Sequence, residues 1–290
     1  MNGILLVDKP AGMTSQNVIS RIKHALHLSK IGHAGTLDPL ATGLLVVLTN
    51  DATKLSDYIM GHDKAYEVRI ALGKSTDTED ASGVVLNSKP VTHLSEVDSV
   101  LIGLQGPLMQ VPPMYSSVHH QGKKLYEYAH KGIEVERVAR SVQIYDCYRT
   151  SEVVLNQNEA EFSFIAKVSK GTYIRTLCVE IGNRLEYPAY MKDLRRIQSG
   201  KWTIGQAFTL DDILEGHYKL LPMIDAFHDE IIYEVSGDSL DDVLHGRPLL
   251  APIPQVSPEV KQIVIAHQGD LLGVYEKHEN SYKARRIWNV

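Results

Sequence analysis

The sequence predicts an α+β protein, built on a mainly antiparallel mixed sheet flanked by helices and ending in a small β-rich part. Three observations predict this class. Strand-like and helix-like segments are mixed, without the regular alternation that a parallel α/β sheet requires. Residues 142–147, 153–155 and 160–169 are strand-like runs in succession, which is typical of an antiparallel meander. Beyond residue 231, short β-like runs are punctuated by glycines.

The first fifty residues predict two strands around a helix. Residues 4–7 are an apolar run that ends at the turn signal Lys9-Pro10-Ala11-Gly12. Thr14 or Ser15 then caps a helix whose apolar residues lie on one face. Residues 44–49 form a second apolar strand.

The middle of the chain continues this mixture. Residues 65–73 alternate between apolar and polar side chains, as a half-buried strand does. Residues 94–104 and 174–185 carry apolar residues at helical spacing. The prolines and glycines within residues 105–122 predict a long irregular loop.

An acidic stretch at residues 211–242, which contains Pro222, predicts a domain boundary. We expect a large domain over residues 1–230 and a small β-rich domain over residues 231–290. A domain of about 60 residues is marginally stable by itself, so we expect the small domain to dock on the large one.

Composition excludes several classes of protein. The chain has 290 residues, 43% of them hydrophobic, which is enough to form a sizeable core. The apolar run at residues 44–48 is far shorter than the roughly 20 residues that span a bilayer, and residues 1–10 show no secretory signal. Cys147 and Cys178 form no disulfide framework and lack metal-ligand spacing, so we expect a cytoplasmic protein without a membrane segment.

The distribution of charge permits nucleic-acid binding, although the formal net charge is −5. Residues 9–37 contain four Lys or Arg and no acid, and residues 167–201 contain eight Lys or Arg against three acids. A polyanion binds to a local positive face and not to the average charge. Ordinary solvated surface explains the same pattern, and charge alone favours that interpretation.

The segment at residues 32–43, GHAGTLDPLATG, is the most unusual one. Its three glycines indicate tight turns, and Pro39 favours an extended or turn conformation for Asp38. The loop lacks the Lys-Ser/Thr ending of a nucleotide-binding P-loop, and no paired acid lies near Asp38 to hold magnesium. A plain Asx-type turn explains an isolated Asp-Pro equally well.

This loop resembles the catalytic loop of the tRNA pseudouridine synthase B family, bacterial stand-alone type, whose members make pseudouridine-55 in the T loop of tRNA. Further family motifs follow in the same order over about residues 3–205. They are LVDKPAGMTS at 6–15, KAY at 64–66, VPPMYS at 111–116 with GKKLY at 122–126, SKGTYIRTL at 169–177 and LRR at 194–196. The resemblance implies the pseudouridine synthase fold with a PUA-like C-terminal domain.

The resemblance also assigns catalytic roles. Asp38 corresponds to the catalytic aspartate and Tyr66 to the tyrosine that stacks on the target uracil. Tyr173 and Arg175 correspond to pocket residues, with the arginine paired to the aspartate so as to favour its ionised form. Leu194, interpreted as a helical residue, is expected to be the apolar wall opposite Tyr66, although singly each of these residues is more often core or surface.

The remaining assignments concern RNA. His33 corresponds to the residue that inserts among the T-loop bases, and Gly35 and Thr36 of the same loop are expected to lie against the RNA. Lys9, with Pro10, is expected to support the active-site loop. The implied partner is the T stem-loop of tRNA, without a guide RNA, a cofactor or a metal, and a monomer is expected.

Two positions depart from the family pattern, Ser117 where alanine is usual and His119 where lysine is common. The main alternative function is a non-catalytic tRNA-binding or tRNA-folding protein, whose expected sign, replacement of Asp38 or Arg175, is absent. A guide-dependent relative and a magnesium-dependent phosphate hydrolase are further alternatives.

Overall fold

The computed structural model describes residues 1–116, 118–129, 131–254 and 256–288, so Ser117 lies outside the described residues. Within them the α-helices and 3-10 helices are α1 (Ser15–Ala25), η1 (Asn50–Leu55), α2 (Ser56–Met60), α3 (Val97–Ile102), α4 (Leu125–Ala129), α5 (Ile174–Arg184), η2 (Ile204–Gln206), α6 (Leu210–Leu214), η3 (Met223–Phe227) and α7 (Asp238–Leu244). Strands of the first two-thirds are β1 (Gly3–Lys9), β2 (Ile31–His33), β3 (Thr42–Thr49), β4 (Lys64–Leu72), β5 (Lys74–Thr76), β6 (Val85–Ser88), β7 (Gly106–Gln110), β8 (His119–His120), β9 (Lys123–Lys124), β10 (Arg140–Arg149), β11 (Val154–Asn156), β12 (Glu159–Val168) and β13 (Ala189–Ser199). The last strands are β14 (Trp202–Thr203), β15 (Phe208–Thr209), β16 (Ile232–Glu234), β17 (Leu249–Leu250), β18 (Gln262–His267), β19 (Asp270–His278) and β20 (Ser281–Ile287).

One large sheet organises most of the chain. Among the described residues it has 11 strands, and its main order is β15-β1-β3-β13-β4-β12-β10-β7. Most neighbours pair antiparallel, whereas β13 with β3 and β1 with β15 are parallel. The mainly antiparallel, mixed α+β sheet predicted from the sequence is confirmed.

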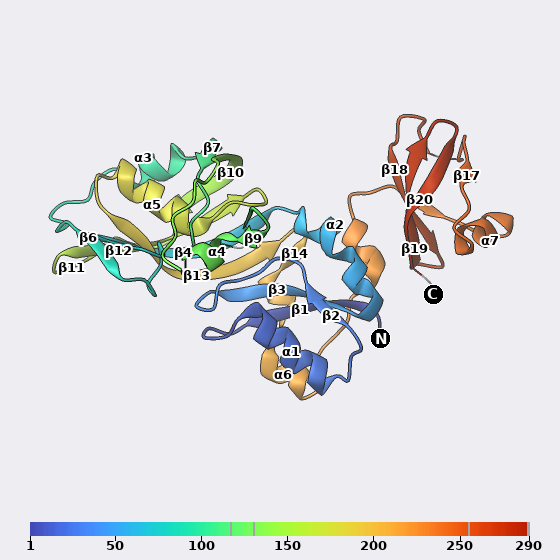
Figure 1. The fold of residues 1–290 in the computed structure, drawn as a ribbon, viewed down its shortest axis with the longest axis horizontal. Helices are drawn as coiled ribbons and strands as arrows, with labels where there is room; N and C mark the ends of the chain where they lie inside the picture. The colour runs from blue at the N-terminus through green and yellow to red at the C-terminus, as the bar shows by residue number, and fades with distance from the viewer. Residues whose placement is uncertain (117, 130, 255, 289–290) are drawn as a thin grey trace.

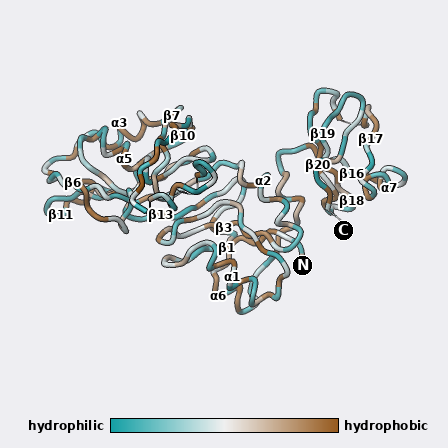
Figure 2. Tube along the Cα trace, viewed as in Figure 1, coloured by the Kyte–Doolittle hydropathy of each residue, from teal (hydrophilic) through white to brown (hydrophobic). Residues whose placement is uncertain are grey.

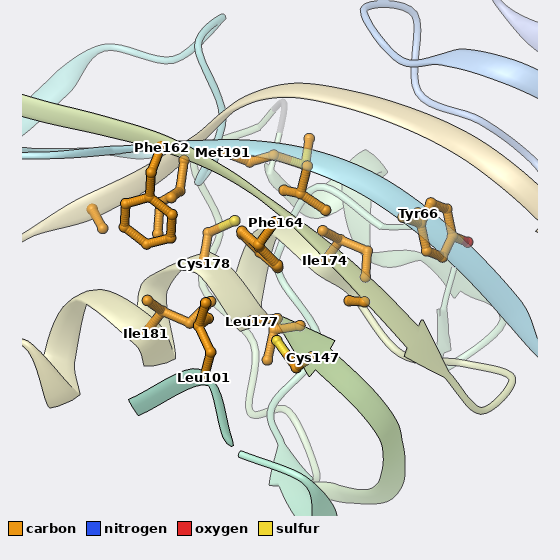
Figure 3. Packing of buried hydrophobic residues seen from close by; sticks show 14 of the residues in the cluster. Tyr66, Leu101, Cys147, Phe162, Phe164, Ile174, Leu177, Cys178, Ile181 and Met191 are labelled. Carbon is orange, nitrogen blue, oxygen red and sulfur yellow. The ribbon is translucent and has the colours of Figure 1, made fainter. Parts of the chain in front are cut away.

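The helices cover the large sheet in separate groups. α3 and α5 pack on the β4–β12–β10 part, where Phe162, Phe164 and Ile181 belong to one fully apolar cluster. Figure 3 shows the side chains of this cluster between α5 and the strands. α1 and α6 cover one face of β1 and β3, so both halves of the sheet are anchored by buried side chains.

Among the described residues, strands β16 to β20 form a second sheet of five strands, in the order β16-β18-β19-β20-β17. Figure 1 shows it beside the large sheet, with α2 on the side of the large sheet that faces it. Trp288 is fully buried in a cluster that also holds Phe227 and Leu55, and its indole Nε1 donates to the carbonyl of Asp51 at 3.1 Å. The small sheet is therefore docked on the large one by buried apolar contacts. Figure 2 shows that hydrophobic segments run through both sheets.

Two sequence-based expectations need correction. The segment 105–122 is not wholly irregular, because β7 forms within it and pairs with β10. Pro107 is compatible with β7, an edge strand that has a neighbour on one side only. Leu194, taken as helical, lies in β13, a strand that the sequence analysis missed.

No helix among the described residues is long and apolar enough to cross a membrane.

Candidate active site

A cavity of about 780 Å³ opens between the loop after β2, strand β4, the start of α5 and the segment after β7. Its walls bring together six of the residues selected from the sequence, namely Thr36, Asp38, Tyr66, Tyr173, Arg175 and Leu194. These residues are up to 158 positions apart in the chain (194 − 36), so the fold gathers them. We call this cavity the nucleotide pocket, after the uridine that the family resemblance leads us to expect in it.

Asp38 stands on the loop between β2 and β3, which is fixed from both sides. The Gly12 amide donates to the Pro39 carbonyl at 2.9 Å, and the Ser15 hydroxyl exchanges hydrogen bonds with the backbone of Leu37. The side chain of Asp38 is 40% exposed, whereas the backbone of its loop is held by these hydrogen bonds. The carboxylate is thus presented to the pocket from a fixed position.

Arg175 faces Asp38 from the first turn of α5. Its Nε lies 3.2 Å from Oδ2 of Asp38, and its side chain is only 6% exposed. The other guanidinium nitrogens donate to the carbonyls of Thr78 at 3.1 Å and Tyr115 at 2.8 Å. Asp80, itself buried, lies 3.9 Å away on the far side. The guanidinium is therefore oriented by its surroundings, and one edge remains for Asp38.

The electrostatics of Asp38 differ from the simple expectation of an arginine-stabilised carboxylate. Burial raises the pKa of Asp38 above its ordinary value, and the charge of Asp80 raises it further. Arg175 and Lys9 lower the same pKa but do not overcome burial. Arg175 thus limits the rise and favours the ionised form against desolvation.

Tyr66 and Leu194 come from neighbouring strands. Tyr66 lies on β4 and is 8% exposed, and Leu194 lies on β13 in register with Val68, two residues further along β4. Figure 3 shows Tyr66 at one end of the hydrophobic cluster, with its hydroxyl directed away from the other labelled side chains. Tyr173 precedes α5 as its N-cap residue, and its backbone exchanges two hydrogen bonds with Gln110.

Three of the selected residues do not line the pocket. Lys9 is fully buried, and its Nζ donates to the carbonyls of Pro10, Met13 and Pro39, so it ties the Asp38 loop to the N-terminal turn. The Gly35 carbonyl accepts from Arg196 at 3.0 Å. His33 is half-buried on β2, and burial together with Arg196 lowers the pKa of its imidazole.

The sequence analysis gave no role to Asp80 and Arg196. Asp80 lies in the turn between β5 and β6, where the hydroxyls of Thr78 and Ser82 donate to its carboxylate. The sequence around Asp80 does not indicate that the folded chain brings its carboxylate to 3.9 Å from Arg175. Arg196 is 1% exposed and donates to the carbonyls of Leu44 and Gly35, so it joins β13 to the Asp38 loop. The sequence shows Arg196 within a basic motif, but it does not show that this side chain is buried.

Solved structures and relatives place this fold among those of known proteins. The fold is shared with a chain of an H/ACA RNP bound to a substrate RNA containing 2′-deoxyuridine, with a TM-score of 0.71 and 21% identity over 98% of this chain and 84% of that one. A chain of a Cbf5-Nop10-Gar1 complex gives a TM-score of 0.70 and 22% identity, covering 98% of this chain and 84% of that one. At such identities the likeness concerns the fold.

Sequence comparison gives the family. Residues 23–174 match the TruB family pseudouridylate synthase N-terminal domain, and residues 175–229 match the tRNA pseudouridylate synthase B C-terminal domain. The tRNA pseudouridine synthase B of Streptococcus sanguinis is 39% identical, covering 99% of this chain and 100% of the relative. That of Bacillus subtilis is 45% identical, covering 73% of this chain and 70% of the relative. The chain belongs to the TruB family of pseudouridylate synthases, and its fold is the pseudouridine synthase fold.

Proposed function

We propose that this chain converts uridine-55 in the T loop of tRNA to pseudouridine. The observation that carries the proposal is the ion pair between Asp38 and Arg175 in a pocket that Tyr66 also lines. Membership of the TruB family, whose relatives are named tRNA pseudouridine synthase B, supports tRNA as the substrate. We extend the assignment to the single position and to the roles of the residues.

The reaction is an isomerisation whose atoms balance within one nucleotide. The N1–C1′ bond breaks, the uracil turns, a C5–C1′ bond forms, C5 gives up its proton and N1 gains one. It needs no oxidant, reductant or group donor. A carboxylate serves this chemistry as a nucleophile toward C6 or C1′, or as a base at the sugar, and these routes share the need for an ionised Asp38.

The pocket walls serve the extruded base. Flipping a base out of a folded loop costs a few kcal/mol, and stacking on an aromatic ring recovers about 1–3 kcal/mol. Tyr66 is the proposed stacking partner and Leu194 the opposing wall, with Tyr173 beside Arg175. The hydroxyl of Tyr66 is also the proposed base that removes the C5 proton.

The residues around the pocket are proposed to hold the RNA. His33 would fill the space left by the flipped base, Gly35 and Thr36 would contact the T loop, and Lys9 would fix the catalytic loop through its three carbonyl partners. We propose residues 231–290 as a PUA-like domain that contacts the acceptor-stem side, in a cytoplasmic enzyme that works as a monomer without a guide RNA.

The test is tritium release from a tRNA transcript labelled at C5 of uridine, with chelator present and no cofactor added. We expect release from one uridine per tRNA, and none when the T-loop uridine is replaced. Asp38→Asn should abolish release while tRNA binding stays within about twofold, because the amide keeps the shape but not the charge. Tight binding by the wild type without any release would instead favour a tRNA-folding protein.

A further inference from the structure

A second cavity, of about 390 Å³, lies where four segments converge. They are the loop from α2 to β4, the end of β12, the turn between β13 and β14, and the residues after η3. Figure 1 shows α2 and β14 at the end of the large sheet nearest the small C-terminal sheet. Three lysines line the cavity, Lys64, Lys167 and Lys201, and we call it the lysine hollow. None of the residues assigned to catalysis lines it.

The acids in the lysine hollow are already engaged. The carboxylate of Asp63 accepts from the Tyr145 hydroxyl at 3.3 Å. Asp229 is paired with His228 at 2.9 Å, and its side chain is 86% exposed. Neither acid is within 4 Å of a lysine of the hollow in the described part of the chain. The charge of Asp63 acts on Lys64 only from beyond 4 Å, so among the described residues no carboxylate of the hollow is in contact with one of its three lysines.

Lys64 is the central charge. It is 8% exposed, and its Nζ donates to the carbonyls of Met60 at 3.1 Å and His62 at 2.5 Å, which are dipoles without net charge. Burial lowers the pKa of this ammonium to about 8. Lys167 is exposed, with no ion pair among the described residues, and Lys201 has only a long contact with Asp225 at 3.7 Å. A buried cation with no anion in contact with it is costly, and a bound anion lowers that cost.

The lysine hollow adjoins the nucleotide pocket. Lys64 and Tyr66 are two residues apart on β4, so their side chains leave the same face of the sheet about 7 Å apart along the strand. The charge of Lys170, next to the pocket residue Gly171, acts on Lys64.

We propose that the lysine hollow binds one backbone phosphate of the RNA whose target uridine enters the nucleotide pocket. The inference rests on the proposed function, since it takes RNA as the substrate and the pocket as the place of the flipped base. A phosphate supplies the anion that Lys64 lacks, and the exposed ammonium groups of Lys167 and Lys201 reach it from the two other walls. Such a contact positions the strand without reading sequence.

The first test measures binding of a T-arm RNA against salt. Lys167→Ala and Lys201→Ala are chosen because both side chains are exposed, so the variants should fold. Each lost phosphate contact should lower the slope of log K against log salt by about 0.7–0.9. The deficit of each variant should therefore shrink about threefold between 50 and 200 mM salt. Lys89→Ala is the control, because Lys89 lies over Tyr187, outside the hollow, and its slope should equal that of the wild type.

The second test identifies the phosphate. A set of T-arm RNAs is made in which each RNA carries one uncharged methylphosphonate at a different position near the target uridine. We expect that one RNA of the set binds the wild type more weakly, by the same factor as the Lys167→Ala substitution causes. The same RNA should bind the Lys167→Ala variant no more weakly than the unmodified RNA does. Unchanged slopes in both variants, or losses that simply multiply, would overturn the phosphate site. Tritium release from the wild type is followed in parallel. Its absence would count against the proposed function, whereas normal release with unchanged slopes would refute the phosphate site alone.

Discussion

Replacing Arg175 by glutamine should move the acid limb of the pH–rate profile to higher pH. The Nε of Arg175 and Oδ2 of Asp38 are 3.2 Å apart. With an effective dielectric constant of about 20, this distance corresponds to about 5 kcal/mol. The Asp38 side chain is 40% exposed, so solvent screening reduces the effect to about 1.4–2.7 kcal/mol, or about one to two pKa units.

The direction follows from the charges. Burial already raises the pKa of Asp38, and Arg175 opposes that rise, so its removal raises the pKa further. In the proposed mechanism the ionised carboxylate is the active form, so kcat/KM on the acid side should fall at a pH one to two units higher than in the wild type. Tritium release measured from pH 5 to 9 gives this profile.

A matched control separates charge from helix stability. Arg184 lies on the same helix, is paired with Glu180 and does not line the nucleotide pocket. Arg184→Gln should leave the acid limb where it is. An acid limb that stays in place in Arg175→Gln, at whatever rate, would show that the guanidinium does not act on the charge of Asp38.

Three further substitutions, one of them with a matched control, test other parts of the site. Tyr66→Phe keeps the stacking ring, so turnover within about threefold of the wild type would exclude the hydroxyl as an essential base, and a larger loss would support it. Gly43→Ala should destabilise the fold by about 2–4 kcal/mol in urea unfolding, because Gly43 has φ +98° and a Cβ would lie 2.3 Å from the Arg196 carbonyl. Gly12→Ala, with positive φ but open space, should cost only about 1 kcal/mol, and equal losses would contradict the close approach. Lys9→Met should reduce a pH dependence by one lysine's share. Burial lowers the pKa of Lys9 to about 8, so wild-type stability gains up to about 1.4 kcal/mol per pH unit from this group as pH increases from about 8 toward 10. Lys64, whose pKa is also about 8, keeps its own share in the variant. An identical slope in the variant would refute that assignment.

Local signals in the sequence predicted the elements that bury an apolar face. Thr14 was one of two candidate caps, and its hydroxyl accepts from the Asn17 amide at 3.0 Å at the start of α1. Strand β13 escaped prediction because its polar face is neutralised by remote partners, such as Asp8 for Arg195 and Glu161 for Lys192. These ion pairs join residues far apart in the chain, so no window of sequence contains the reason for a strand.

The candidate site likewise combines features that the sequence predicted with features that only the tertiary fold creates. Family resemblance selected the residues that line the nucleotide pocket, and the spacing of motifs carried that resemblance. The rise in the pKa of Asp38 depends on burial and on Asp80, and both are products of the tertiary fold. The burial of Lys64 likewise comes from the convergence of four segments, although the basic stretch to which Lys167 and Lys201 belong was apparent in the sequence.

The position of β13 has a consequence for the folding of the enzyme during its synthesis on the ribosome. β13 lies between β3 and β4, although these two strands precede it by more than a hundred residues. Asp38 and Tyr66 are therefore synthesised early, but the strand that joins their halves of the sheet emerges only at residues 189–199. Until then the nascent chain carries two unsealed sheet edges, which are prone to mispairing. The nucleotide pocket can therefore be completed only after β13 has been synthesised, because Leu194, which lines the pocket, lies on that strand.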